Sequence, residues 1–195
     1  MKVIAFNGSP HENGNTFLAL SAALDEISKE GIEVEMINIG SRDIFGCKAC
    51  GGCADGECAF GDDWFREMTR KVIEADGVIL GGPVYYASIN GTMKSFLDRL
   101  FYQRGMKAKM RHKFGACVAI CRRAGSVGTF DHLNHYLLIS EMIAIGSTYW
   151  NIGIAGHGYP MNEDAEGMNT MRQMGKNLAW LLKMKEYSKD VIVEP

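Results

Sequence analysis

Four cysteines lie within twelve residues, in the segment CKACGGCADGEC at residues 47–58. Cys47, Cys50, Cys53 and Cys58 follow the spacing C-x2-C-x2-C-x4-C. Thiolates this close together can ligate an iron–sulfur cluster, bind zinc, or remain free and prone to oxidation. Structural zinc sites usually pair two separated C-x2-C units or include histidine, so a single loop of thiols favours a cluster over zinc. Free or partly disulfide-linked thiols stay open as an alternative.

A second segment, NGSPHENGNT at residues 7–16, follows a short apolar run and precedes a helical pattern. The first backbone N–H groups and the positive dipole end of such a helix attract an anion, and Ser9, Asn15 and Thr16 would add side-chain donors. The alternative is a helix capped by Asn13 or Asn15, although capping needs only one such residue. The segment lacks both the Walker lysine and the G-x-G-x-x-G spacing. It therefore predicts a site for a single phosphomonoester.

The elements that must position these segments alternate along the chain. Apolar runs predict strands at residues 2–7, 33–39, 77–83, 114–121 and 147–154. Helical periodicity covers residues 15–31, 62–75, 90–105, 127–145 and 162–186. This alternation predicts an α/β fold, with a doubly wound, five-stranded parallel sheet and helices on both faces. Ligands of such sheets bind at the carboxyl ends of the strands, close to the point where the strand order reverses.

The composition of the chain narrows the classes of function. Its 195 residues are 47% hydrophobic and 23% charged, which is typical of one folded domain. A net charge of −2 gives no reason to expect a nucleic-acid partner. No apolar run reaches the roughly 18 residues of a membrane span, and the apolar start is too short for a secretory signal. We therefore expect a cytoplasmic protein without membrane contact. In the apolar run FGACVAIC, Cys117 is predicted to be a buried structural thiol.

Three motifs together resemble one known superfamily. These are GSPHENGNT after the first strand, GGPVYYASINGTMKSFLDR at the end of the third, and the cysteine run itself. They resemble the flavodoxin-like, NADPH-dependent FMN reductase superfamily and, within it, the iron–sulfur flavoproteins. The resemblance extends to STYWNIGIAGHG and NEDAEGMNTM. It implies a flavodoxin-like fold with FMN as cofactor, in one FMN-binding domain over residues 1–195 with a cysteine-rich loop at 43–61.

The resemblance also implies which residues bind the flavin. The expected cofactor-binding residues are Ser9, Pro10, Asn13, Asn15 and Thr16 in the first loop, Pro83, Val84, Tyr85, Tyr86 and Ser88 in the second, and Arg122, Arg123 and Gly125 in the third. The second loop lines the isoalloxazine ring in the family, and the third borders the pyrimidine side. The alternatives are edge aromatics that pack on the following helix at Tyr85 and Tyr86, and a solvated basic turn at Arg122 and Arg123.

The compact cysteine spacing matches the iron–sulfur flavoproteins, which implies that Cys47, Cys50, Cys53 and Cys58 ligate one [4Fe-4S] cluster. Related flavin reductases carry a similar loop without a cluster. Because the loop begins at the carboxyl end of the second strand, we expect the cluster at the ligand-bearing edge of the sheet, serving a flavin of its own or a neighbouring chain.

The expected function is an FMN-dependent oxidoreductase that relays electrons between the cluster and FMN, with the chemistry at the flavin. The expected partners are ferredoxin or NAD(P)H as electron donor, a small-molecule acceptor, and further copies of the chain in a homodimer or homotetramer. Two alternatives are an NAD(P)H-dependent FMN or quinone reductase that uses FMN alone, and a non-enzymatic flavodoxin-type electron carrier.

Overall fold

The computed structural model describes residues 1–53 and 56–191. The expected cysteine-rich loop at 43–61 therefore contains two positions, 54 and 55, that lie outside the described residues. The expected domain boundary at residue 195 also lies outside them, together with 192–194.

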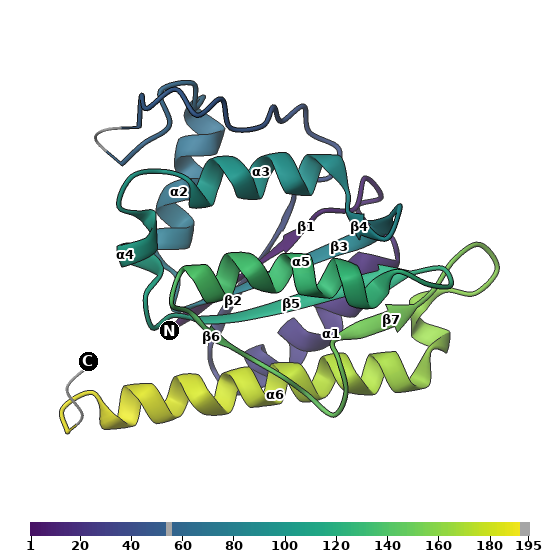
Figure 1. The fold of residues 1–195 in the computed structure, drawn as a ribbon. Coiled ribbons are helices and arrows are strands. Elements are labelled where there is room, and N and C mark those ends of the chain that lie inside the picture. The colour runs from purple at the N-terminus through teal and green to yellow at the C-terminus, as the bar shows by residue number, and fades with distance from the viewer. Residues whose placement is uncertain (54–55, 192–195) are drawn as a thin grey trace.

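A parallel sheet forms the centre of the fold (Figure 1). Its strands are β1 (Lys2–Asn7), β2 (Glu33–Asn38), β3 (Gly77–Tyr85), β5 (Phe114–Cys121) and β6 (Ile143–Ala144), in the order β2-β1-β3-β5-β6. A short strand β7 (Ile152–Ile154) also pairs in parallel with β5, and β4 (Ser88–Ile89) forms an antiparallel hairpin with β3. The strand order reverses between β1 and β3, so the loops that follow these two strands flank the point where ligands bind in doubly wound sheets.

Helices cover both faces of the sheet. One face packs against α1 (Asn15–Lys29) and α6 (Ala165–Ser188). The other packs against α2 (Asp63–Glu74), α3 (Gly91–Phe101), α4 (Met106–Met110) and α5 (Ser126–Ile139). The predicted flavodoxin-like, doubly wound parallel sheet is confirmed. Within the described residues, no helix is long and apolar enough to cross a membrane.

The continuous apolar strands follow from burial on both faces. In β1, Val3 and Ala5 pack into the core beneath α1 and α6, whereas Ile4 and Phe6 pack into the opposite core. Successive side chains of a strand point to opposite faces, so the interior positions of a doubly covered strand favour apolar residues. Cys117 on β5 is 1% exposed, which confirms the predicted buried thiol, and its burial raises the pKa well above the usual value.

The region after β5 differs from the prediction. The helix predicted at 127–145 ends at Ile139, and Glu141 adopts a left-handed φ of 56° that leads into β6. The strand predicted at 147–154 is shortened to β7. The fifth strand of the sheet therefore consists of two short pieces, because β6 pairs with the start of β5 and β7 pairs with its end. Side-chain hydrogen bonds stabilise the loop between them, because Asn151 donates to the Ile145 carbonyl at 3.1 Å and accepts from the Ser147 hydroxyl at 2.6 Å. Strand propensity alone does not reveal such bonds.

The helix predicted at 90–105 is shorter in the structure. It corresponds to α3, which ends at Phe101, and a separate helix, α4, begins after Gly105, its N-cap with a φ of +79°. A left-handed residue cannot continue an α-helix, and glycine adopts this conformation at the least cost.

Candidate functional site

The loop after β1 is held by a buried asparagine at the end of that strand. Asn7 accepts a hydrogen bond from the Ser9 backbone N–H at 3.0 Å and donates to the Asn38 side chain at 2.9 Å. The Ser9 hydroxyl in turn accepts from the backbone N–H of His11 at 3.2 Å. These bonds fix the path of the chain from β1 to the start of α1.

The start of α1 has no side-chain cap. Its N-cap is Gly14, with no capping hydrogen bond from a side chain, so the alternative of a cap by Asn13 or Asn15 is wrong. The side-chain oxygen Oδ1 of Asn15 instead accepts from the backbone N–H of Met161 at 2.9 Å, which ties α1 to the segment before α6. Uncapped first-turn N–H groups are what an anion requires at a helix N-terminus. Of the other predicted residues here, Thr16 is buried, whereas Pro10 and Asn13 are exposed.

The loop after β3 is a tight hairpin turn. Tyr85 pairs with Ser88, and the two residues between them, Tyr86 and Ala87, have left-handed φ angles of 50° and 59°. Positive φ at both central residues is the type I′ geometry, which costs energy for residues other than glycine and is often found at functional sites. The Tyr86 side chain is fully exposed and Tyr85 is 47% exposed. The alternative that Tyr86 packs on the following helix is therefore wrong.

The loop after β5 lies against this turn. Gly125 has a φ of +86°, and a Cβ atom added to it would lie 2.7 Å from Ala87 Cα and 3.1 Å from Val84 Cγ1. The Ser88 hydroxyl lies 2.9 Å from His132 Nδ1 of α5, which adds a polar contact between the same two segments. The structure thus brings together the second and third predicted loops. Arg122 and Arg123 are exposed beside them.

A buried asparagine joins the first and second loops. Asn90, 3% exposed, donates through Nδ2 to the Gly8 carbonyl at 2.8 Å, and its Oδ1 has no hydrogen-bond partner among the described residues. The Gly8 N–H donates to the Gly81 carbonyl of β3 at 2.8 Å. Sequence reasoning missed Asn7 and Asn90 because it searched for ligand-binding groups. Their positions in the sequence could have indicated them, because Asn7 is the last residue of the first strand and Asn90 directly precedes a helix.

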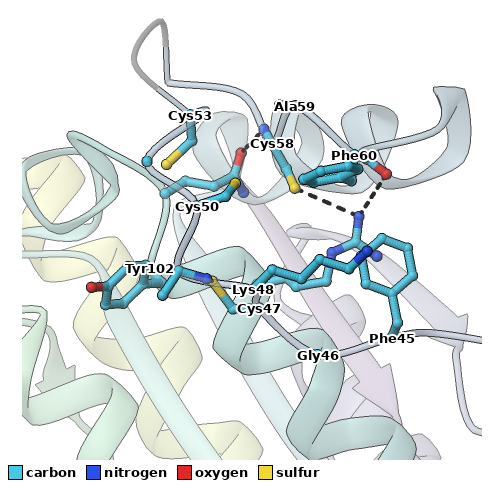
Figure 2. Close-up of a pocket in the computed structure, with 14 residues that line it drawn as sticks. Phe45, Gly46, Cys47, Lys48, Cys50, Cys53, Cys58, Ala59, Phe60 and Tyr102 are labelled. Carbon is cyan, nitrogen blue, oxygen red and sulfur yellow. Dashed lines mark hydrogen bonds between the residues drawn. The ribbon is translucent and has the colours of Figure 1, made fainter.

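The four cysteines line a single pocket (Figure 2). The backbone N–H of Ala49 points at Cys47 Sγ and that of Gly52 at Cys50 Sγ, both at 3.4 Å. Left-handed φ angles at Ala49 (50°) and Gly51 (70°) turn the chain between the cysteines. Donation from residue i+2 to the sulfur of residue i suits a sulfur that carries negative charge.

The fourth cysteine is anchored from α3 and the residues after it. The Cys58 backbone N–H donates to the Gln103 side-chain oxygen at 3.1 Å, and Cys58 Sγ lies 3.7 Å from Nη2 of Arg99. Gln103, 4% exposed, also donates to the Thr69 hydroxyl and the Leu100 carbonyl. The sequence analysis missed Arg99 and Gln103. Their i, i+4 spacing places both on one face of the predicted helix at 90–105, but it does not say what that face contacts.

The expected position of the cysteines at the ligand-bearing edge of the sheet is wrong. The loops predicted to bind FMN lie at the start of α3, beside the β3–β4 hairpin, whereas the cysteine pocket is lined by Arg99 in the last turn of this helix and by Tyr102 and Gln103 after it. Figure 1 shows the chain after β2 running along α3 toward α4. The eleven residues of α3 span about 16 Å at 1.5 Å per residue, and Arg99 lies in the last turn of this helix, away from Gly91.

Residues 1–157 match the NADPH-dependent FMN reductase family. The chain belongs to this family. It is 34% identical over 192 residues to an iron–sulfur flavoprotein of Methanocaldococcus jannaschii, covering 94% of this chain and 98% of the relative. It is 40% identical over 188 residues to an iron–sulfur flavoprotein of Archaeoglobus fulgidus, covering 95% and 82%. The superfamily expected from the motifs is therefore confirmed, together with the relatives expected within it.

Solved structures support the flavodoxin-like fold of this FMN reductase family member. A flavone reductase superposes with a TM-score of 0.75 at 18% identity, over 96% of this chain and 65% of the flavone reductase. An archaeal flavodoxin superposes with a TM-score of 0.62 at 14% identity, over 94% and 99%. At these identities the likeness concerns the fold. Family membership makes the protein a flavin-dependent oxidoreductase and supports FMN as its cofactor, with a reductant and an acceptor as its reaction partners.

The thiols of the cysteine pocket are of the type that ligates an iron–sulfur cluster. Within residues 1–53 and 56–191, no three Cys, His, Asp or Glu side chains are grouped closely enough to hold a single metal ion. Four thiols in one pocket, with N–H donors directed at two sulfurs, are the ligands and hydrogen bonds that such clusters use.

Proposed function

We propose that this FMN reductase family member transfers electrons between FMN and a [4Fe-4S] cluster held by Cys47, Cys50, Cys53 and Cys58. The observation that carries the proposal is the convergence of these four thiols on one pocket, two of them with backbone N–H donors at the sulfur. The names of the curated relatives, which are iron–sulfur flavoproteins, support it.

The proposed FMN site lies at the carboxyl edge of the sheet. The uncapped start of α1, with Ser9, Asn15 and Thr16 nearby, would bind the phosphate. The turn formed by Pro83, Val84, Tyr85, Tyr86 and Ser88 would line the isoalloxazine ring, and Gly125 allows the third loop to approach that turn. Arg122 and Arg123 would supply positive charge at the pyrimidine side. Pro10 and Asn13 complete the proposed first loop.

The chemistry of this proposal belongs to the cofactors. A bound flavin supplies both one- and two-electron transfer, and a bound cluster supplies one-electron transfer. The protein binds and orients both groups, and no side chain is proposed as a catalytic acid or base. We propose ferredoxin or NAD(P)H as the reductant and a small molecule as the acceptor. We place the protein in the cytoplasm, where the thiols of a cluster loop stay reduced.

We also propose a homodimer or homotetramer. Large apolar side chains are exposed at the end of α5 and on the edge strand β6, among them Leu138 (60%), Ile139 (71%) and Ile143 (44%). Exposed apolar side chains that gather in this way mark contact surfaces. An oligomer would let the cysteine pocket of one protomer face the flavin edge of its partner, as an alternative to the flavin of its own chain.

The proposal is tested by purifying the protein without oxygen and measuring its absorption, iron and acid-labile sulfide. We expect bound flavin with about four iron and four sulfide per chain. Cys58→Ala should lose the iron and keep the flavin. Cys117→Ala, which alters a thiol buried in the core, should keep both. Flavin without iron in the wild-type protein would contradict the proposal.

A second candidate is an NAD(P)H-dependent reductase that uses FMN alone, with the four cysteines as free thiols. The family match, to NADPH-dependent FMN reductases, favours this candidate. It predicts steady-state oxidation of NADH or NADPH by iron-free protein. Reduction by ferredoxin with no turnover of either nucleotide would contradict it, and would favour the cluster-containing enzyme or a flavodoxin-type carrier.

A further inference from the structure

Arg99 is a buried cation in the wall of the cysteine pocket. The residue is 6% exposed and belongs to α3. Its guanidinium carbon lies 4.0 Å from the ring centroids of both Phe45 and Phe65. Nη2 donates to the Phe60 carbonyl at 3.1 Å and reaches Cys58 Sγ at 3.7 Å (Figure 2). None of these contacts is a carboxylate.

One donor of this guanidinium is unsatisfied. The Nε–H is buried and has no hydrogen-bond partner within the described part of the chain. A buried charge that lacks a counter-charge is costly, and so is a buried donor that lacks an acceptor. Because arginine stays protonated in proteins, the cost cannot be relieved by loss of a proton. Negative charge at the Cys58 sulfur, 3.7 Å from Nη2, would balance the charge of the guanidinium.

We propose that Arg99 is the cation that balances the negative charge of the iron–sulfur site and raises its reduction potential. The inference rests on the proposed function, since it requires a cluster on the four cysteines. The only sulfur of this set that an arginine contacts in the described residues is that of Cys58. Arg99 is thus a positioning residue for the fourth ligand as well as a buried positive charge at its sulfur, and Lys48 is a second cation in the lining of the pocket.

The direction of the effect follows from electrostatics. Adding one electron makes the net charge of the site one unit more negative, and no proton or bond change is needed. A fixed cation near the sulfur stabilises the more negative state, and does so strongly in a buried, low-dielectric position. Net charge and hydrogen bonds to the sulfurs are the main determinants of cluster potentials.

The test is a midpoint titration of the cluster in protein purified without oxygen, with iron and sulfide measured on each sample. Arg99→Met keeps an unbranched stem between the two rings and removes the charge, and Arg99→Lys keeps the charge. We expect Arg99→Met to shift the one-electron equilibrium at least tenfold toward the oxidised state, which corresponds to about 59 mV. We expect Arg99→Lys to stay within about threefold of the wild type.

Arg42→Gln is the matched control. Arg42 is an exposed cation 4.2 Å from the Trp64 ring centroid. Like the four cysteines, it belongs to the connection between β2 and α2. Its removal should leave the cluster potential unchanged. The flavin potential should be unchanged in all three variants, because the FMN loops lie at the other end of α3.

The outcomes distinguish an effect of the Arg99 charge from an effect of the shape of its side chain. Arg99→Met with full iron and a wild-type cluster potential would overturn the inference. If Arg99→Met folds and binds flavin but loses its iron while Arg99→Lys retains it, the inference is supported. Equal effects of both variants would overturn it. If Arg99→Met does not fold, Arg99→Gln replaces it under the same criteria. Wild-type protein without iron would refute the proposed function itself, and the iron assay identifies that case separately.

Discussion

Gly40 packs directly against the backbone of Ser9. A Cβ atom on Gly40 would lie 2.1 Å from the Ser9 carbonyl carbon and 2.4 Å from the Gly8 carbonyl oxygen. Gly40 follows β2 and Ser9 follows β1, so the ends of two neighbouring strands press together at the proposed phosphate site. Only glycine permits so close an approach of two backbones.

Gly40→Ala is expected to displace the first loop. An added methyl group has no room at this contact, and forced overpacking typically costs about 1–3 kcal/mol of unfolding free energy. We expect at least tenfold weaker binding of FMN to the apoprotein, measured by quenching of flavin fluorescence. Gly146→Ala is the control, because no atom lies within 4 Å of the added Cβ there. Equal affinities of the two variants would contradict the prediction.

Gly125→Ala combines a steric contact with backbone strain. A φ of +86° costs a residue with a Cβ roughly 1 kcal/mol or more, and the new Cβ would also meet Ala87 at 2.7 Å. Gly31→Ala isolates the strain, since its φ is +75° and nothing lies within 4 Å. We expect both variants to be less stable in urea, and we expect Gly125→Ala to lose more unfolding free energy than Gly31→Ala. Only Gly125→Ala should also bind FMN at least tenfold more weakly. An equal loss of FMN affinity in Gly31→Ala would contradict this prediction, because the contact with Ala87 would then not be the cause of the loss.

Gln103→Leu should release the fourth cysteine. It removes the acceptor of the Cys58 backbone N–H and leaves that donor unsatisfied, at a cost of about 1–3 kcal/mol in unfolding free energy. We expect a lower midpoint in urea and faster loss of iron to a chelator. Gln173→Leu is the control, because it breaks only a Gln173–Asn177 side-chain bond on α6. An unchanged rate of iron loss in Gln103→Leu would show that this anchor does not hold the metal site.

Tyr136 should make the fold sensitive to alkaline pH. Burial, followed by the hydrogen bond that its hydroxyl donates to Asp98 at 2.5 Å, raises the pKa of Tyr136 to about 12. The usual value is about 10, so folding favours the protonated hydroxyl. Its contribution to stability is complete below about pH 10 and is lost as the pH rises toward about 12.

The measurement is urea unfolding of the wild type and Tyr136→Phe at several pH values. Tyr136→Phe should be less stable by about 1 kcal/mol at neutral pH, through loss of one hydrogen bond. The difference between the two proteins should shrink between pH 10 and 12. A difference that stays constant across this range would contradict the assignment.

Local patterns were sufficient for the central sheet and its helices. The run KVIAFN became β1 with its expected bounds, and Asp62 caps α2 by accepting from the Phe65 backbone N–H at 2.8 Å. Prediction failed where tertiary contacts override periodicity. The 127–145 pattern could not show that Glu141 would leave the helix, because the backbone partners of β6 come from β5, some thirty residues earlier.

The sequence by itself determined the types of chemistry present: four closely spaced thiols, a polar loop before a helix, and the FMN reductase motifs. Residue type and spacing carry that information because cluster ligation and anion binding each depend on a short stretch of chain. Only the tertiary structure decided that the cysteine pocket lies beside the last turn of α3, away from the proposed flavin loops at the start of this helix. Only the tertiary structure also placed Arg99 and Gln103 against Cys58, more than forty residues earlier, because side-chain packing between distant segments determines such contacts.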